Sequence, residues 1–292
     1  MPNLFCRDRC GLSHEKDLIR FLGLSLGGGK TDKASLAALD YYPQQRRLFL
    51  SKVIEKIKPE DELSGDTLLV QDLLSLQSRA VSLHTDVPFR LPSCILCSLP
   101  CPGHEACQEP HIRWMWAYEN DQRRKKRPRK VFTPYTQRCI DLYLQTEYDE
   151  PFQTQHALGS NAAPLLARAI FLKKRIQMPW REVPTNAAVW RLGRGMQVMK
   201  SHLRSFRKSV GGEDARHAIL EAFLERQTVF IYEQDRKILI RNHHAFEAFI
   251  CSFVGFLEHK EAIEPRPANW PAYEDWPSIP KEDAIAASMS GK

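Results

Sequence analysis

The stretch RFLGLSLG, residues 20–27, predicts the first strand of a sheet, because a short apolar run ends there in glycines. The next residues, GGGKTD (27–32), predict a turn. Two further strand-like runs follow, KASLAALDYY (33–42) and RRLFLSKVIEKI (46–57), with only a short Pro-containing turn at 43–45 between them. We therefore expect the chain to open with a three-stranded antiparallel meander.

The rest of the pattern alternates helices with strands. Residues 66–79 predict a helix with a leucine-rich side, and AVSLHTDVPF (80–89) predicts a fourth strand with Asp86 near its C-terminal end. Three strands, a helix and a further strand predict an α/β fold. The later expected elements are a helix at 161–175, a strand within 176–183, helices at 186–207 and 213–226, a hairpin at 228–240 and a last helix at 242–259.

Composition limits the class of protein. The chain has 292 residues, of which 43% are apolar, so it suits one large domain with insertions. It has no apolar run long enough to span a bilayer, and the polar start MPNLFCRDRC does not resemble a secretory signal. We expect no membrane association and a cytoplasmic location. The net charge of +7 permits an acidic partner without requiring one.

Three regions differ in composition. We expect an α/β domain over 19–262, interrupted at 90–135 by a Cys-rich and basic insertion. The segment 263–292 is rich in Pro and Trp, and we expect it to be a tail that covers the surface without regular structure.

Five segments occur in the order found in one known family. FLGLSLGGGKTDKASLAAL (21–39), HTDVPFRLP (84–92), TQRCIDLYL (136–144), REVPTNAAVWRLGR (181–194) and HHAFEAFICSF (243–253) resemble its motifs. The family is the bacterial predicted-nuclease family of the RNase H fold, domain of unknown function family 429, a distant relative of the RuvC resolvases. The resemblance implies an RNase H-like mixed sheet, an antiparallel meander plus parallel strands, flanked by helices. It also implies metal-dependent phosphodiester hydrolysis of nucleic acid.

The resemblance also implies an acidic catalytic site. Nucleases of this fold hold one or two Mg²⁺ or Mn²⁺ ions on carboxylates that come from neighbouring strand ends and a late helix. The matching catalytic candidates here are Asp86, Glu182, His244 and Glu247. His244 and Glu247 are three residues apart and therefore share one face of the predicted helix.

The chain departs from the family pattern at two ligand positions. Ser25 stands where the family has the first-strand Asp, and His244 stands where it has an acid. An imidazole favours Mn²⁺ or Zn²⁺ over Mg²⁺, so we expect little or no Mg²⁺-dependent cleavage. A second hypothesis is a nucleic-acid-binding protein that keeps the fold without the chemistry. Taken singly, Asp86 also fits a turn cap, and Glu182 and Glu247 also fit solvated positions.

The glycine-rich turn offers a third hypothesis. Ser25, Gly28 and Lys30 are candidate phosphate-binding residues, as in the first hairpin of nucleotide-binding actin-like relatives of the RNase H fold. The spacing does not match a Walker A loop. The alternative is a hairpin whose glycines supply positive φ angles.

The cysteines form the sharpest local pattern. Cys94, Cys97, Cys101 and Cys107 lie within fourteen residues, and His104 is a substitute ligand. In a reducing compartment such spacing favours a metal site, either Zn²⁺ or an iron–sulfur cluster. The alternative is a set of reduced thiols or a disulfide that packs the insertion.

A basic run follows three aromatic residues, Trp114, Trp116 and Tyr118. This combination fits phosphate contact with base stacking, so nucleic acid, DNA or RNA, is the expected partner. The alternatives are a solvated loop and aromatic residues that belong to the core. The nucleic-acid-binding candidates are Arg123, Arg124, Lys125, Lys126, Arg127 and, from the arginine motif, Arg138.

Overall fold

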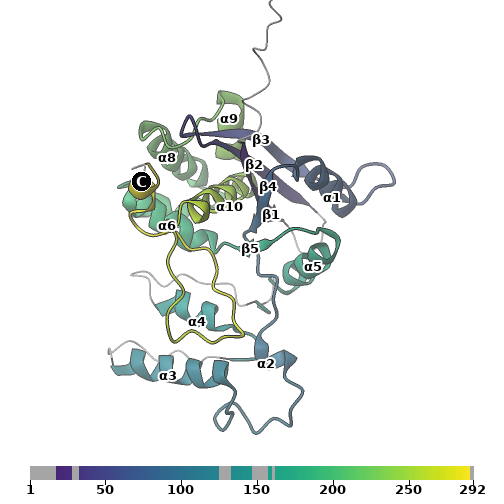
Figure 1. Ribbon diagram of the computed structural model, residues 1–292, viewed down its shortest axis with the longest axis vertical. Helices are drawn as coiled ribbons and strands as arrows, with labels where there is room; N and C mark the ends of the chain where they lie inside the picture. The colour runs from purple at the N-terminus through teal and green to yellow at the C-terminus, as the bar shows by residue number, and fades with distance from the viewer. Residues whose placement is uncertain (1–17, 28–32, 125–132, 147–156, 160–161, 290–292) are drawn as a thin grey trace, which may run out of the picture.

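The computed structural model describes residues 18–27, 33–124, 133–146, 157–159 and 162–289, and Figure 1 shows their arrangement. They form an α/β fold with helices on both sides of a sheet. The α/β class and the mixed sheet expected from the sequence are confirmed. In the described part of the chain, no helix combines the length and the apolar character needed to cross a membrane.

Five strands make one mixed sheet in the order β3-β2-β1-β4-β5. The first three strands pair antiparallel as a meander, whereas β4 runs parallel to β1 and β5 runs parallel to β4. The strands are β1 (Ile19–Leu26), β2 (Ala34–Tyr42), β3 (Arg47–Ile57), β4 (Ala80–Thr85) and β5 (Trp180–Glu182).

The register of the parallel strands brings three candidate residues to one edge. Leu24 of β1 pairs with Thr85 of β4, and Thr85 pairs with Glu182 of β5. Ser25 follows Leu24 and Asp86 follows Thr85, so Ser25, Asp86 and Glu182 meet where the parallel strands end. Ligand sites in open α/β sheets typically form at such carboxyl ends.

Eleven helices belong to the described residues. They are α1 (Gly65–Leu76), α2 (Ser93–Leu96), α3 (Pro110–Arg124), α4 (Cys139–Thr146), α5 (Ala162–Arg175), α6 (Thr185–Gly195), α7 (Lys200–Ser205), α8 (Gly212–Glu225), α9 (Glu233–Arg241), α10 (His243–His259) and α11 (Ala284–Met289).

Two sequence predictions of local structure are wrong. The expected hairpin at 228–240 is largely the helix α9, which has Glu233 and Asp235 in its first turn and Arg241 in its last, where the helix dipole favours each charge. The single helix expected at 186–207 is divided into α6 and α7. Gln197 has a φ of 63° between them, and this left-handed conformation ends α6.

The helix α10 packs directly on the sheet, and it carries the candidate residues His244 and Glu247. A Cβ atom built on Gly23 of β1 would lie 1.9 Å from the carbonyl oxygen of Ala248, so only glycine permits this contact. Thirteen residues of α10 are buried, from Ala245 to Leu257. This burial fixes the helix against β1 and β2.

The C-terminal segment differs from the expected surface tail. Trp270 and Ile279 are buried, and the backbone NH of Ser278 donates to the carbonyl oxygen of Glu182 at the end of β5. The indole of Trp270 lies edge-on to Trp114, with ring centroids 4.8 Å apart. The tail has little regular structure, as expected, but the expectation that it covers the surface is wrong, because its aromatic rings pack into the core.

Candidate functional site

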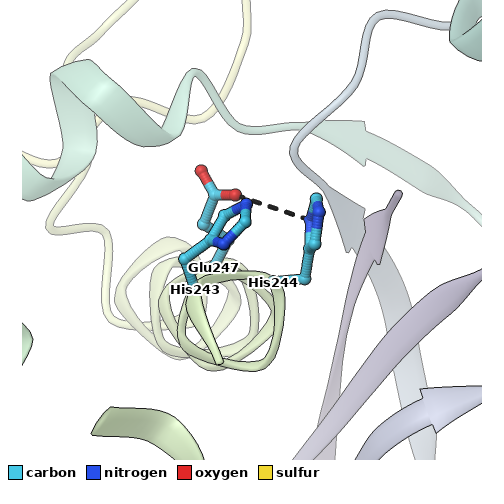
Figure 2. Close-up of side chains that lie close together, drawn as sticks. All are labelled: His243, His244 and Glu247. Atoms are coloured by element: carbon cyan, nitrogen blue, oxygen red, sulfur yellow. Dashed lines mark ion pairs between the residues drawn. The ribbon is translucent and has the colours of Figure 1, made fainter. Parts of the chain in front are cut away.

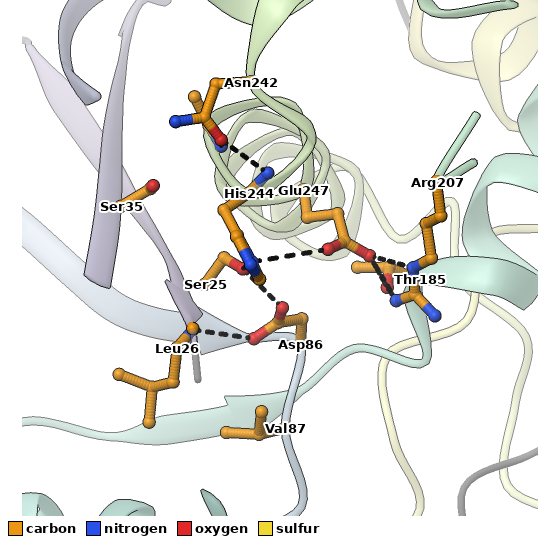
Figure 3. A network of polar contacts seen from close by, with 12 residues as sticks. Ser25, Leu26, Ser35, Asp86, Val87, Thr185, Arg207, Asn242, His244 and Glu247 are labelled. Atoms are coloured by element: carbon orange, nitrogen blue, oxygen red, sulfur yellow. Dashed lines mark hydrogen bonds and ion pairs between the residues drawn. The ribbon is translucent and has the colours of Figure 1, made fainter. Parts of the chain in front are cut away.

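A buried polar network joins β1, the end of β4 and the first turn of α10 (Figure 3). The Ser25 hydroxyl donates to Asp86 Oδ2 at 2.6 Å and lies 3.0 Å from His244 Nδ1. The backbone NH of Leu26 donates to Asp86 Oδ1 at 3.3 Å. The structure thus brings together three side chains that are distant in sequence.

The network continues to Glu247 on the same helix. Glu247 Oε2 lies 3.9 Å from His244 Nδ1, and Oε1 accepts hydrogen bonds from Thr185 (3.1 Å) and from Arg207. Arg207 also donates to the Thr185 hydroxyl at 2.7 Å. Glu247 is 2% exposed, so its charge is compensated by a partner rather than by water.

A cap sets the position of these helical residues. The side chain of Asn242 accepts hydrogen bonds from the backbone NH groups of His244 (2.9 Å) and Ala245 (3.3 Å), which begins α10 at this point. The cap therefore fixes where α10 begins, and with it the positions of His243, His244 and Glu247 near the start of this helix.

Burial changes the protonation of the site. Desolvation, followed by the charge of Glu247, raises the pKa of Asp86 to about 7 against the opposing hydrogen bond from Ser25. Burial also lowers the pKa of His243 and of His244. Both imidazoles are therefore neutral near pH 7, which is the form that binds metals.

Three of these side chains form a cluster with the geometry of a metal site (Figure 2). One ligand atom from each of His243, His244 and Glu247 lies within 4.8 Å of the others. It is the one such group of at least three His, Cys, Asp or Glu residues found among the residues that the structure describes. His243 was not among the site residues predicted from the sequence. Its four-residue separation from Glu247 puts both on one helix face, and this spacing was the available signal.

Ser25, a predicted phosphate-binding residue, is not placed to contact a ligand. Its side chain is completely buried, and its hydroxyl donates to Asp86. Ser25 therefore orients the neighbouring carboxylate and the imidazole of His244.

Glu182 lies at the same end of the sheet but is already paired. It shares a pocket with Asp86, Arg138 and Arg207. Arg138 donates to both oxygens of Glu182, at 2.6 and 2.7 Å, and to Asp141 at 2.9 Å. Arg138, which was expected to contact nucleic acid, is 6% exposed. It is therefore buried in the lining of this pocket and does not lie on an open surface.

Several other predicted residues fall where the structure gives no side-chain description. Gly28 and Lys30 of the glycine turn lie outside the described residues, as do Lys125, Lys126 and Arg127. Arg123 and Arg124 form the end of α3.

The three aromatic side chains before the basic run are partly buried. Trp114 stacks on Tyr118 with ring centroids 4.7 Å apart, and Trp116 stacks on His104 at 5.7 Å. All three also pack against the hydrophobic core. This arrangement favours the core role over base stacking, because these ring faces already have partners.

The four clustered cysteines line one pocket. They are free thiols, and no three of them bring their sulfur atoms within 4.8 Å of one another. This arrangement is wider than the closed zinc geometry expected from their spacing.

Comparison with known proteins gives no match of any kind: no family model, no curated protein and no solved structure is significantly similar to this chain. The resemblance to the predicted-nuclease family therefore rests on the motifs alone.

Proposed function

We propose that this protein is an RNase H-like, metal-dependent phosphodiesterase that acts on nucleic acid and uses Mn²⁺ or Zn²⁺ rather than Mg²⁺. The strand order β3-β2-β1-β4-β5, with an antiparallel meander followed by two parallel strands, supports the RNase H-like assignment. The convergence of the candidate residues at the ends of the parallel strands supports the location of the site.

The observation that carries the proposal is the cluster of His243, His244 and Glu247 beside Asp86. Two imidazoles and one carboxylate suit a first-row transition ion better than Mg²⁺, which prefers oxygen ligands. Both imidazoles are neutral because burial lowers the pKa of each. The cluster is therefore ready to bind a metal ion at neutral pH.

Two neighbouring groups supply the remaining chemistry. The pKa of Asp86 is about 7, which suits a general base that takes a proton from the attacking water. Arg207 lines the same pocket as Asp86, and a metal ion held by Glu247 would compensate the carboxylate charge and free the guanidinium for a phosphate oxygen. Asp86 would take the proton of the attacking water as its oxygen bonds to phosphorus, and the ester oxygen would leave as its bond to phosphorus breaks and take a proton from solvent.

A second function follows from one specific observation. Arg207 already compensates the charge of Glu247, and Ser25 supplies no negative charge where the resembling family has an Asp. A cleft with so little uncompensated negative charge suits a protein that binds nucleic acid without cleaving it.

The test is a cleavage assay on 5′-labelled single- and double-stranded DNA and RNA, with Mg²⁺, Mn²⁺ or Zn²⁺ added in turn. We expect cleavage with Mn²⁺ or Zn²⁺ and little with Mg²⁺. Glu247→Gln keeps an oxygen for Arg207 and Thr185 but loses the charge, so it should lower the rate by about 100-fold or more, as should His243→Ala. His217→Ala, which removes an exposed histidine of α8, is the matched control.

The same assay separates the two functions. Binding in a gel-shift experiment without cleavage under any metal would support the non-catalytic function. Strong Mg²⁺-dependent cleavage would contradict the metal preference argued from Ser25 and His244.

A further inference from the structure

A second set of side chains of the types that bind metals begins at Cys94, eight residues after Asp86. Cys94, Cys97, Cys101 and Cys107 line one pocket of about 250 Å³. His111, in the first turn of α3, lines the same pocket. Five donors typical of soft-metal sites therefore face one space.

His111 has no partner that explains its burial. Its side chain belongs to a residue that is 5% exposed, and neither ring nitrogen has a hydrogen-bond partner within the described residues. Leaving a buried polar group without a hydrogen-bond partner is unfavourable. An imidazole in this position, which lines the same pocket as four thiols, is suited to binding a metal ion.

The histidine predicted as a substitute ligand is placed elsewhere. The ring of His104 stacks on Trp116, and its Nε2 lies 3.2 Å from Glu105. His104 does not line the thiol pocket. The structure therefore points to His111 as the imidazole of this site.

The segment that carries the cysteines has little apolar packing of its own. Its helix α2 has only four residues, and none of them is buried. Ile95, Leu96 and Leu99 are 48%, 65% and 63% exposed. A metal ion that joins this segment to α3 would supply the missing crosslink, as structural zinc does in small domains.

We propose that Cys94, Cys97, Cys101, Cys107 and His111 form a structural centre for a thiolate-bound metal, either a zinc ion or an iron–sulfur cluster, that ties the cysteine segment to α3. This centre is separate from the His243–His244–Glu247 cluster and does not depend on the proposed function. Its role is to hold the insertion in place beside the tail.

The spacing of the thiols bears on the type of metal. Zn–S bonds near 2.3 Å place the sulfurs of a zinc site about 3.8 Å apart. No three of the four thiols come within 4.8 Å here, although all of these residues lie in the described ranges. A zinc ion therefore requires the cysteine segment to contract around it.

The experiment is elemental and spectroscopic analysis of the full chain, purified without oxygen and without metal-affinity resin. We expect about one zinc per chain, or iron with acid-labile sulfide, because four ligands complete either type of site. Protein stripped of metal should take up Co²⁺ and develop thiolate-to-cobalt charge-transfer absorption. The elemental analysis distinguishes a zinc site from an iron–sulfur cluster, and either result supports a thiolate centre.

Variants locate the centre. Cys97→Ser with Cys101→Ser alters only exposed positions, so the protein should fold and lose the metal. His111→Ala should weaken metal retention against a chelator by about 10-fold or more, and His104→Gln, in the same segment, should not. Protein that contains neither zinc nor iron and takes up no Co²⁺ with all thiols reduced overturns the proposal. A disulfide among the four cysteines under these conditions overturns it as well.

Discussion

Replacing Asp86 with Asn should stabilise the metal-free protein at alkaline pH. The carboxyl is desolvated and faces Glu247, and together these raise its pKa to about 7. The substitution removes the charge but keeps the contacts: the new amide oxygen accepts from the Leu26 NH, and the amide NH₂ donates to Ser25. The Ser25 hydroxyl then donates to His244 Nδ1, which lies 3.0 Å away.

The sign and size of the effect follow from proton linkage. The pKa of an aspartate is 3.8 in the unfolded chain and about 7 here, so the folded state holds a proton that the unfolded state has lost between these values. Wild-type stability therefore falls as the pH rises from about 4 to about 7. The full shift corresponds to at most about 4 kcal/mol. It is an upper limit, because the residue keeps some solvent exposure.

Urea unfolding at pH 5 and pH 8, with a chelator present, measures this difference. Asp86→Asn should exceed the wild type in free energy of unfolding by up to about 4 kcal/mol at pH 8 and by much less at pH 5. Glu62→Gln, at an exposed position, is the control and should change neither value. An Asp86→Asn protein that is less stable than the wild type at pH 8 would refute the reasoning about the buried carboxyl.

Three further predictions test the frame around the site. Gly23→Ala places a Cβ against the Ala248 carbonyl, so it should lower the free energy of unfolding by about 1–3 kcal/mol or more and weaken Mn²⁺ binding. Thermal unfolding measures the first effect and metal titration the second. An unchanged melting temperature would contradict the contact. Burial raises the pKa of Glu274 to about 7, so the folded state carries an unfavourable buried charge at pH 8 but not at pH 5. Glu274→Gln should therefore raise the free energy of unfolding at pH 8 and not at pH 5. Equal gains at both pH values in urea unfolding would contradict this. Arg138→Gln should cost about 3–5 kcal/mol, because it removes the positive charge shared by the carboxylates of Glu182 and Asp141; a loss below about 1 kcal/mol in urea unfolding would contradict the buried network.

Much of the sheet was predictable from the sequence because its signals are local. The apolar runs at 20–27, 33–42 and 46–57 become β1, β2 and β3, and the fourth strand, expected over 80–89, forms as β4 but ends at Thr85, immediately before Asp86. Short turns between these runs leave few alternative pairings. The position of Asp86 beside Ser25 does not follow from these turns; it was expected only because the resemblance implies that the fourth strand lies parallel beside the first.

The elements that were predicted wrongly depend on tertiary contacts. The apolar residues of TVFIYEQDRKILI fit a hairpin, yet its second half forms α9, and Phe230 alone bridges to β3 within the described residues. The tail was expected on the surface because of its prolines, but Trp270 packs against Trp114 of α3, which is distant in the sequence. Such contacts leave no periodic pattern in the sequence.

The candidate site was predictable in part. Motif order indicated Asp86, His244 and Glu247, which the structure places in one network. Arg207, which neutralises Glu247, comes from a segment 40 residues earlier and carries no distinguishing pattern. His111 was missed for the same reason, because only its burial without a hydrogen-bond partner among the described residues identifies it.

The most direct measurement of the central claim is an anomalous diffraction map of crystals soaked in Mn²⁺ at about pH 7.5, where both imidazoles are neutral. The account predicts one peak bonded to His243, His244 and Glu247, with the Arg207 guanidinium moved from Glu247 toward the pocket that it shares with Asp86. Mn²⁺ should displace the ion pair because two neutral imidazoles and one carboxylate already surround the position. A map with no peak there, and with Arg207 still bonded to Glu247, would contradict the account.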